Sequence, residues 1–253
     1  MKITILGSGT STGVPMVGCR CPVCCSDDPH DARTRPSLLV ESDGHSIVVD
    51  TSTDLRQQAI REKLSSIDAV LFTHSHADHV NGIDDLRGFY FIHRRLIPCY
   101  GDTQTMDAIT SRFPYIFKGL EVEGYAPLME AHTISGPFEL FGCLITPIPL
   151  LHGPYPSTGF RFNNAAYLTD CSAVIPSSIP LLSGLELLVI DALRYTPHEN
   201  HFNIAGALEV ISELRPRRAL LTHLTHEVAH RDSVRLPHGV EFAYDGMVVG
   251  LDS

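Results

Sequence analysis

Apolar residues occur along the chain mainly in short runs, a pattern typical of buried strands. Such runs predict strands at residues 2–6, 37–41, 47–50, 69–72, 98–100, 138–140, 143–148, 159–162, 165–169, 187–191 and 218–221. The pairs Asp43-Gly44, Phe141-Gly142 and Asn163-Asn164 stand between neighbouring runs and predict hairpins, and Asp245-Gly246 predicts a last hairpin. Strands therefore recur through both halves of the chain.

Helices are expected between these strands. Residues 54–63, opened by Asp54, residues 103–112, capped by Thr103, and residues 204–214 have the required pattern. Helices interleaved with strands pack on the outer faces of sheets, so the order of elements predicts an α/β fold, a four-layer αββα sandwich. The length and the lack of a low-complexity linker predict a single domain over residues 1–253.

The composition limits the classes of binding partner and the cellular compartment that are expected. Nineteen Lys and Arg against 29 Asp and Glu give a net charge of -10, which disfavours nucleic acid but still allows a small phosphorylated substrate. A signal peptide and a membrane span are not expected, because the start of the chain reads as a strand and no apolar run is long enough. Seven cysteines, an odd count, favour reduced thiols in the cytoplasm.

Metal-binding residue types are concentrated in THSHADH, residues 73–79, directly after the apolar run 69–72. The segment brings together His74, His76, Asp78 and His79 at the expected carboxyl end of a buried strand, where α/β folds place their chemistry. Imidazole and carboxylate at this spacing suit zinc, manganese or iron. The segment therefore predicts a metal site.

Three further polar residues follow predicted strands in the second half of the chain: His152, Asp170 and His223. With the HxHxDH motif, this order resembles the metallo-β-lactamase superfamily of hydrolases over nearly the whole chain. The resemblance implies that His74, His76 and His152 hold one divalent metal, that Asp78, His79 and His223 hold a second, and that Asp170 bridges both. Cys171, next to Asp170, leaves a thiolate ligand open as an alternative. The sequence does not choose between manganese, zinc and iron.

A second metal site is expected near the N-terminus. GCRCPVC places Cys19, Cys21 and Cys24 on one Gly- and Pro-containing loop, with Cys25 adjacent, and thiolates at this spacing favour a structural zinc. The chain resembles PhnP-type cyclic-phosphate phosphodiesterases, and this resemblance implies His226 as the fourth ligand. His230 is an alternative, one helical turn away.

Four more stretches carry the PhnP-like resemblance: GSGTSTGVP at 7–15, GIDDLR at 82–87, DALRYTPHENH at 191–201 and FAYDGM at 242–247. This branch implies hydrolysis of a small or cyclic phosphodiester such as 5-phosphoribosyl 1,2-cyclic phosphate, by a hydroxide that bridges the two metals. It also implies a homodimer.

The same resemblance assigns the catalytic residues. Asp78 is expected to be required as a metal ligand, and His201 to protonate the leaving group, with His198 as the rival acid. Arg194, in the loop that leads to His201, is a candidate for gripping a substrate phosphate, as are Arg87 and Arg161.

Three other functions remain open. A transfer-RNA 3'-processing endonuclease uses a similar two-metal site, but the acidic charge and the lack of a basic Gly/Pro-rich arm argue against it. A thioester or lactone hydrolase would use the same metals on a carbonyl, although the cysteine loop and GIDDLR do not point there. A noncatalytic metal-binding protein is the alternative from another class.

Overall fold

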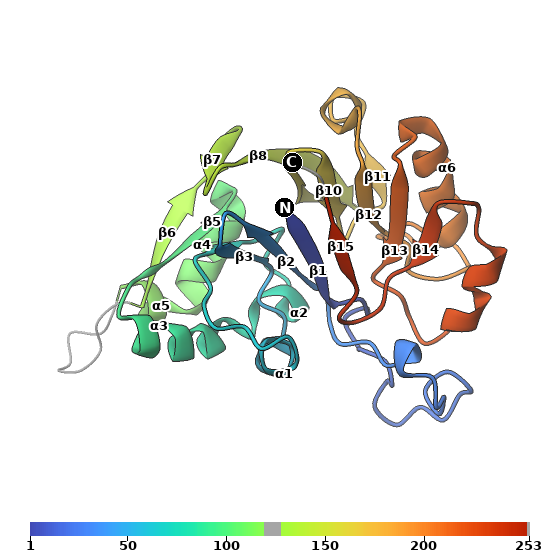
Figure 1. Ribbon diagram of the computed structural model, residues 1–253, viewed down its shortest axis with the longest axis horizontal. Coiled ribbons are helices and arrows are strands. Elements are labelled where there is room, and N and C mark those ends of the chain that lie inside the picture. Colours follow the sequence, from blue (N-terminus) through green and yellow to red (C-terminus); the bar gives the residue numbers. More distant parts are fainter. Residues whose placement is uncertain (119–127, 252–253) are drawn as a thin grey trace.

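The computed structural model describes residues 1–118 and 128–251, and two mixed β-sheets form its centre (Figure 1). The first sheet has the order β15-β1-β2-β3-β4-β5-β6, with β1 (Lys2–Gly7), β2 (Ser37–Ser42), β3 (His45–Val49), β4 (Ala69–Leu71), β5 (Ile97–Gly101), β6 (Met129–Thr133) and β15 (Val248–Gly250). The second has the order β11-β8-β9-β10-β12-β13-β14, with β7 beside β8; its strands are β7 (Phe138–Leu140), β8 (Cys143–His152), β9 (Tyr155–Phe162), β10 (Ala165–Leu168), β11 (Ala173–Val174), β12 (Leu187–Asp191), β13 (Arg218–Thr222) and β14 (Val240–Phe242).

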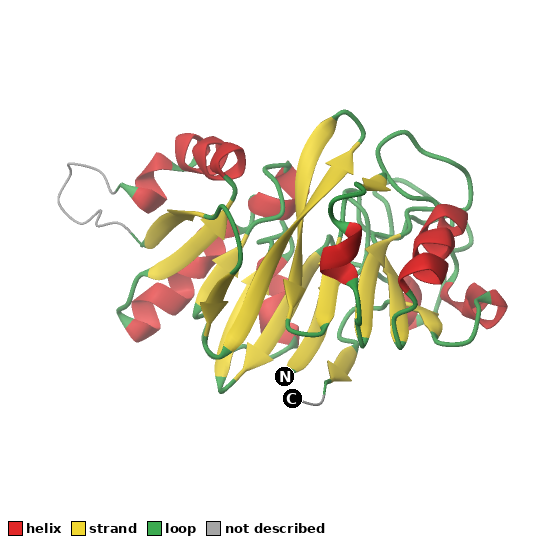
Figure 2. Cartoon of the chain, turned by 90° about the horizontal axis from the view of Figure 1, so that it is seen from above, coloured by secondary structure: helices red, strands yellow, loops and turns green. Residues whose placement is uncertain are grey.

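Helices cover the outer faces of both sheets (Figure 2). The α-helices are α1 (Leu55–Arg61), α2 (Ala77–Val80), α3 (Arg87–His93), α4 (Thr103–Arg112), α5 (Pro114–Phe117) and α6 (Ile204–Leu214), and short 3-10 helices are η1 (Pro29–Asp31), η2 (Ile83–Leu86), η3 (Ile179–Leu182) and η4 (His230–Arg235). The first five α-helices lie on the side of the first sheet and α6 on the side of the second (Figure 1). Within residues 1–118 and 128–251, no helix is long and apolar enough to span a membrane.

Alternating side chains along the strands build three apolar layers. On β2, Leu38 and Val40 point into the core between the sheets, whereas Leu39 points to the layer beneath the helices of the first sheet. On β12, Val189 likewise belongs to the central core and Leu188 to the layer beneath α6. Because each sheet is buried on both faces, its strands read as nearly continuous apolar runs. The predicted αββα sandwich is confirmed.

Three of the predicted hairpins are present, and the fourth is wrong. Asp43, Phe141 and Asn163 have positive φ at the three confirmed turns. Around Asp245-Gly246, however, β14 pairs with β13 in the second sheet, and β15 pairs with β1 in the first. The segment is a crossing between sheets. Asp245 holds it in place by accepting hydrogen bonds from the N–H and hydroxyl groups of Ser8 and Thr34.

Two local predictions also need correction. The N-cap of α4 is Asp102, whose side chain accepts from the Thr105 N–H at 2.7 Å, so Thr103 is the first helical residue and not the cap. The predicted strands at 143–148 and 159–162 are each longer, because β8 and β9 continue as a paired hairpin up to His152 and Tyr155. His152 therefore stands at the end of a strand and not in a loop after it.

Gly82, in the GIDDLR stretch, has no room for a side chain. A Cβ there would lie 1.9 Å from the carbonyl oxygen of Ser52, whereas at Gly88, inside α3, a Cβ would meet nothing within 4 Å. We therefore expect Gly82→Ala to destabilise the fold by about 1–3 kcal/mol through overpacking. Gly88→Ala, the matched control, is expected to stabilise it by up to ~1 kcal/mol. Urea unfolding midpoints measure both, and equal midpoints for the two variants would contradict the expectation.

Candidate metal centre

The carboxyl ends of several strands place the seven predicted ligands. His74 and His76 lie on the loop after β4, while Asp78 and His79 lie on the short helix α2. His152 is the last residue of β8. Asp170 lies two residues after β10, and His223 directly follows β13; both strands have parallel neighbours. The two sheets thus bring the motif and its three separate partners to one place.

Asp170 lies between two groups of histidines. Its Oδ1 is 3.9 Å from Nε2 of His74 and 3.9 Å from Nε2 of His152. Its Oδ2 is 2.9 Å from Nε2 of His79 and 3.2 Å from Nε2 of His223. Each carboxylate oxygen therefore faces its own histidine pair.

Two sets of donor atoms surround this carboxylate. His74, His76 and His152 form one set, and Asp78, His79, Asp170 and His223 form the other; in each set the potential ligand atoms lie within 4.8 Å of one another. Nε2 of His74, His79 and His223 is buried without a hydrogen-bond partner among the described residues. Buried polar atoms require partners, so these convergent orphan atoms fit two divalent cations.

Hydrogen bonds from outside the two sets hold the imidazoles in orientation. Asp50 Oδ2 lies 2.6 Å from Nδ1 of His79 and accepts from the Thr73 hydroxyl at 2.7 Å. The carbonyl of Asn200 lies 2.8 Å from Nδ1 of His152. A proton kept on Nδ1 leaves Nε2 free to bind a metal, which is the usual arrangement of ligating histidine.

Three residues at this edge have left-handed backbone although none is glycine. Asp50, Asp170 and His223 have φ of 63°, 50° and 61°. Side chains rarely adopt this region, and such residues are concentrated at functional sites. The strand ends are bent so that the side chains point into the centre.

The charges of the centre depend on one another. Burial alone would raise the pKa of Asp170, but the adjacent His223 and His79 outweigh burial and hold it well below its ordinary value. Burial lowers the pKa of His74 well below its ordinary value, with help from His79. Burial opposes protonation of His79, but Asp170, Asp50 and Asp78 outweigh it and raise its pKa well above the ordinary value, so a bound cation would replace a proton there.

His201 lies next to this centre, with its ring 4.6 Å from that of His152 and 4.7 Å from that of His223. Its Nδ1 is 2.7 Å from Oδ2 of Asp191, the last residue of β12. Burial opposes protonation, but the hydrogen bond and charge of Asp191 outweigh it and raise the pKa of His201. His198 is mostly exposed. The part of its ring that is desolvated, together with the charge of His201, lowers its pKa.

Asp50 and Asp191 were missed as site residues by the sequence analysis, which used them only as strand ends. Both close an apolar run with a carboxylate, at residues 47–50 and 187–191. The same signal identified Asp170, so it could have identified these two. Cys171, in contrast, belongs to neither set of donor atoms: its thiol bonds the Leu168 carbonyl, and burial raises its pKa well above the ordinary value.

The cysteine loop forms a separate donor cluster. Cys19, Cys21, Cys24 and His226 converge, with Nδ1 of His226 3.4 Å from Sγ of Cys19 and 3.3 Å from Sγ of Cys21. The Cys24 N–H and the His226 ring lower the pKa of Cys21 to about 6, which favours the thiolate. Among the described residues this cluster does not include the adjacent Cys25, and the His230 ring instead lies 4.6 Å from the ring of His30, tilted by 35°.

Zinc content provides the test of this cluster. Cys21→Ser is expected to lower the bound zinc by one ion per chain, because three donors hold zinc far less tightly than four. The matched control is Cys25→Ser, which removes an exposed thiol from the same loop and should keep the wild-type content. Atomic emission on the purified proteins measures both. Equal zinc in the two variants would refute the site.

The three candidate phosphate-gripping arginines all have partners in the structure. Arg194 pairs with Glu227 at 3.3 Å, and Arg87 pairs with Asp84 at 2.7 Å. Arg161 donates to the carbonyls of Leu181 and Ser183. Phosphate binding by Arg194 therefore stays a prediction.

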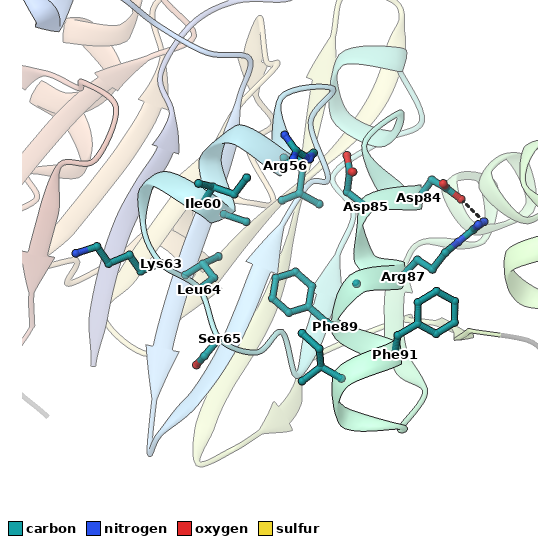
Figure 3. Close-up of a pocket in the computed structure, with 14 residues that line it drawn as sticks. Arg56, Ile60, Lys63, Leu64, Ser65, Asp84, Asp85, Arg87, Phe89 and Phe91 are labelled. Carbon is teal, nitrogen blue, oxygen red and sulfur yellow. Dashed lines mark hydrogen bonds and ion pairs between the residues drawn. The ribbon is translucent and has the colours of Figure 1, made fainter.

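A separate hollow of about 690 Å³ lies on the outer side of the first sheet (Figure 3). Ile60 and Leu64 line one side and Phe89 and Phe91 of α3 line the other. It contains none of the predicted metal ligands. The homodimer implied by the resemblance stays a prediction.

The fold and the two donor sets together define the class of protein. Residues 45–224 match the family model of the beta-lactamase superfamily domain, and the chain belongs to this superfamily. The prediction of a hydrolase of this superfamily is supported by that match and by the structural likeness that follows.

Within the superfamily, the chain is similar to a crystal structure described as a new diphosphatase from the PhnP family. The two are 39% identical, with a TM-score of 0.93, over 99% of this chain and 98% of the other. The predicted PhnP-like resemblance is confirmed. A zinc-bound PqqB from Methylobacterium extorquens shares the fold, with a TM-score of 0.80 and 21% identity over 99% of this chain and 100% of the other.

The chain is also similar in sequence to curated proteins that are described by other activities. An octanoyltransferase of Porphyromonas gingivalis is 39% identical over 100% of this chain, but the chain spans only 52% of that relative's length. A coenzyme PQQ synthesis protein B of Cupriavidus taiwanensis is 26% identical over 98% of this chain and 99% of its own length.

Proposed function

We propose that the chain is a two-metal phosphodiesterase that hydrolyses small phosphodiesters or phosphate anhydrides. The observation that carries the proposal is Asp170, whose two oxygens each face a separate pair of histidines. A carboxylate in this position would hold two cations at a fixed separation, which suits in-line displacement at phosphorus. His74, His76 and His152 would hold one metal, and Asp78, His79 and His223 the other. Manganese, zinc and iron all suit these ligands.

When bound, the two cations supply an activated water and neutralise charge on the phosphate oxygens. The residues of the chain perform the remaining tasks. Asp50 and the Asn200 carbonyl keep His79 and His152 in their binding tautomers. His201, held by Asp191 through Nδ1, presents Nε2 as the atom that protonates the departing oxygen.

The relatives support this reaction more than its competitors. The PhnP-family protein is described as a diphosphatase, so both P–O–C and P–O–P bonds are proposed as targets. A phosphoribosyl cyclic phosphate remains within this class. Octanoyl transfer is not proposed, because the relative of that name is about twice as long as this chain.

A substrate panel tests the proposal. Metal-loaded protein is assayed with bis(p-nitrophenyl) phosphate, cyclic phosphates, diphosphate esters, precursor transfer RNA and a thioester, each ranked by kcat/KM. We expect the phosphodiesters and diphosphates to rank first. A higher kcat/KM for the thioester or the transfer RNA would overturn the proposal, and no turnover of any substrate would favour a noncatalytic metal-binding protein.

Metal removal should also destabilise the protein. A ligand at about 100 times its Kd stabilises a fold by ~2.7 kcal/mol, which for a chain of this size corresponds to roughly 5–10 °C in Tm. Dialysis against a chelator is therefore expected to lower Tm by about that amount, and returning manganese or zinc should restore it. An unchanged Tm would show that the donor atoms hold no ion.

A further inference from the structure

The pocket at the metal centre is small but adjoins a larger groove. Ser75, Gln104 and Tyr155 border the pocket beside the histidines, and its volume is about 160 Å³. The adjoining groove has about 390 Å³ and runs along β8 and β9, opposite the loop at residues 134–137. We propose that this groove binds an apolar group esterified to the substrate phosphate, such as an alkyl or isoprenoid chain. This inference rests on the proposed function.

Shared residues join the two hollows. Asp102 and Pro156 line both of them. The groove residues next to Pro156 also bond to the metal-binding segments: the Ser157 hydroxyl donates to the Asp170 carbonyl at 2.9 Å, and the Thr158 N–H donates to the Thr73 carbonyl at 3.0 Å. The groove therefore begins beside the metal pocket, within reach of a group attached to a phosphate bound there.

The groove is built for an uncharged occupant. Of its described lining residues, none is Lys or Arg, and its walls are mostly apolar: Ile134, Pro137, Pro147, Pro149, Leu150 and Leu181. The hydroxyls of Ser157 and Thr158 are already committed, since the second donates to Asp102 at 3.1 Å. A surface with few free hydrogen-bonding groups favours hydrocarbon over a sugar or a nucleobase.

Asp102, the one charged residue of the groove, is also occupied. Its Oδ1 accepts from the Thr105 N–H and its Oδ2 from the Thr158 hydroxyl. The described lining of the metal pocket likewise contains no Lys or Arg. The described lining of the two hollows thus offers no Lys or Arg to a second anionic group, whereas an alkyl group needs none.

Backbone rigidity makes the groove ready for such a ligand. Proline fixes φ, and Pro147, Pro149 and Pro156 come from β8 and β9, which are paired continuously from Ile145 to His152 of β8. A preformed wall loses little freedom on binding, so its apolar contacts contribute more fully to affinity.

A series of alkyl p-nitrophenyl phosphates, from methyl to octyl, tests the groove with the metal-loaded full chain. We expect kcat/KM to rise by at least about 30-fold from methyl to octyl, because each fully buried methylene is worth ~4-fold and burying two or three of the added methylenes gives this gain. Methyl(octyl)phosphinate, whose two P–C bonds cannot be hydrolysed, should bind more tightly than dimethylphosphinate by a similar factor in calorimetry. No gain with chain length in either measurement would overturn the inference.

Two variants locate the effect. Leu181→Gln places a polar group on the half-exposed groove wall and should reduce the octyl-to-methyl ratio to below about threefold. The control is Leu144→Gln, which changes an exposed leucine of β8 outside the groove and should keep the wild-type ratio. An unchanged ratio in Leu181→Gln would place the chain elsewhere. Failure to hydrolyse even the methyl ester would instead reject the proposed function.

Discussion

Replacing Asp170 by alanine is expected to lower kcat/KM for bis(p-nitrophenyl) phosphate by about 10³- to 10⁴-fold, since two-metal charge stabilisation is worth several kcal/mol. The loss should be large because both oxygens of Asp170 are used, one toward His74 and His152 and the other toward His79 and His223. Metal content should fall together with activity.

Two controls separate chemistry from folding. Asp170 has a φ of 50°, which alanine adopts only with strain, whereas asparagine tolerates it. Asp170→Asn should therefore fold normally, keep one neutral oxygen and still lose most of the activity. Glu241→Gln, an exposed carboxylate change on β14, should remain within twofold of wild type. Full activity in Asp170→Asn would eliminate the bridged two-metal mechanism.

The second large effect is expected at His201 and should depend on the leaving group. General acid catalysis contributes about 10²- to 10⁴-fold, but only where the departing oxygen needs a proton. His201→Ala should therefore slow alkyl and cyclic phosphodiesters by about that factor and p-nitrophenyl esters by only a few-fold. Kinetic comparison of the two substrate types measures the difference.

Neighbouring residues provide the controls for His201. His198→Ala removes the exposed rival ring, 5.2 Å from that of His201, and should have little effect on either substrate. Asp191→Asn keeps the shape but removes the charge that orients Nδ1 of His201, so it should reproduce part of the same leaving-group dependence. An equal loss on both substrates in His201→Ala would show that this residue is not the acid.

The sequence predicted the candidate metal ligands, because their residue types and their order along the chain can be recognised without the structure. His74, His76, Asp78 and His79 form a dense motif, and the order of His152, Asp170 and His223 after strands matched a known pattern. Asp50 and Asp191 escaped notice, because each contacts the site through Nδ1 of a histidine that lies on another element of the fold. Such partnerships are set by how the sheets pack.

The errors in the fold have similar causes. Asp245-Gly246 has the composition of a hairpin turn. However, Asp245 accepts long-range hydrogen bonds from Ser8 and Thr34, and these bonds hold the segment where the chain crosses from one sheet to the other. The full extent of β8 and β9 was missed because Pro149 and Pro156, in the parts left out of the predicted strands, argue against strands in sequence. Local composition cannot register either effect, since tertiary contacts decide both.

The left-handed backbone at Asp50, Asp170 and His223 implies that this protein loses some folding stability in order to assemble its metal centre. Each such residue costs of order 1 kcal/mol relative to an unstrained position. A chain selected only for thermal endurance would accept glycine at these points, yet glycine would remove the very groups that assemble the centre. Efforts to make this protein more heat-resistant should therefore leave the strand ends untouched and seek their gains in helices and surface loops.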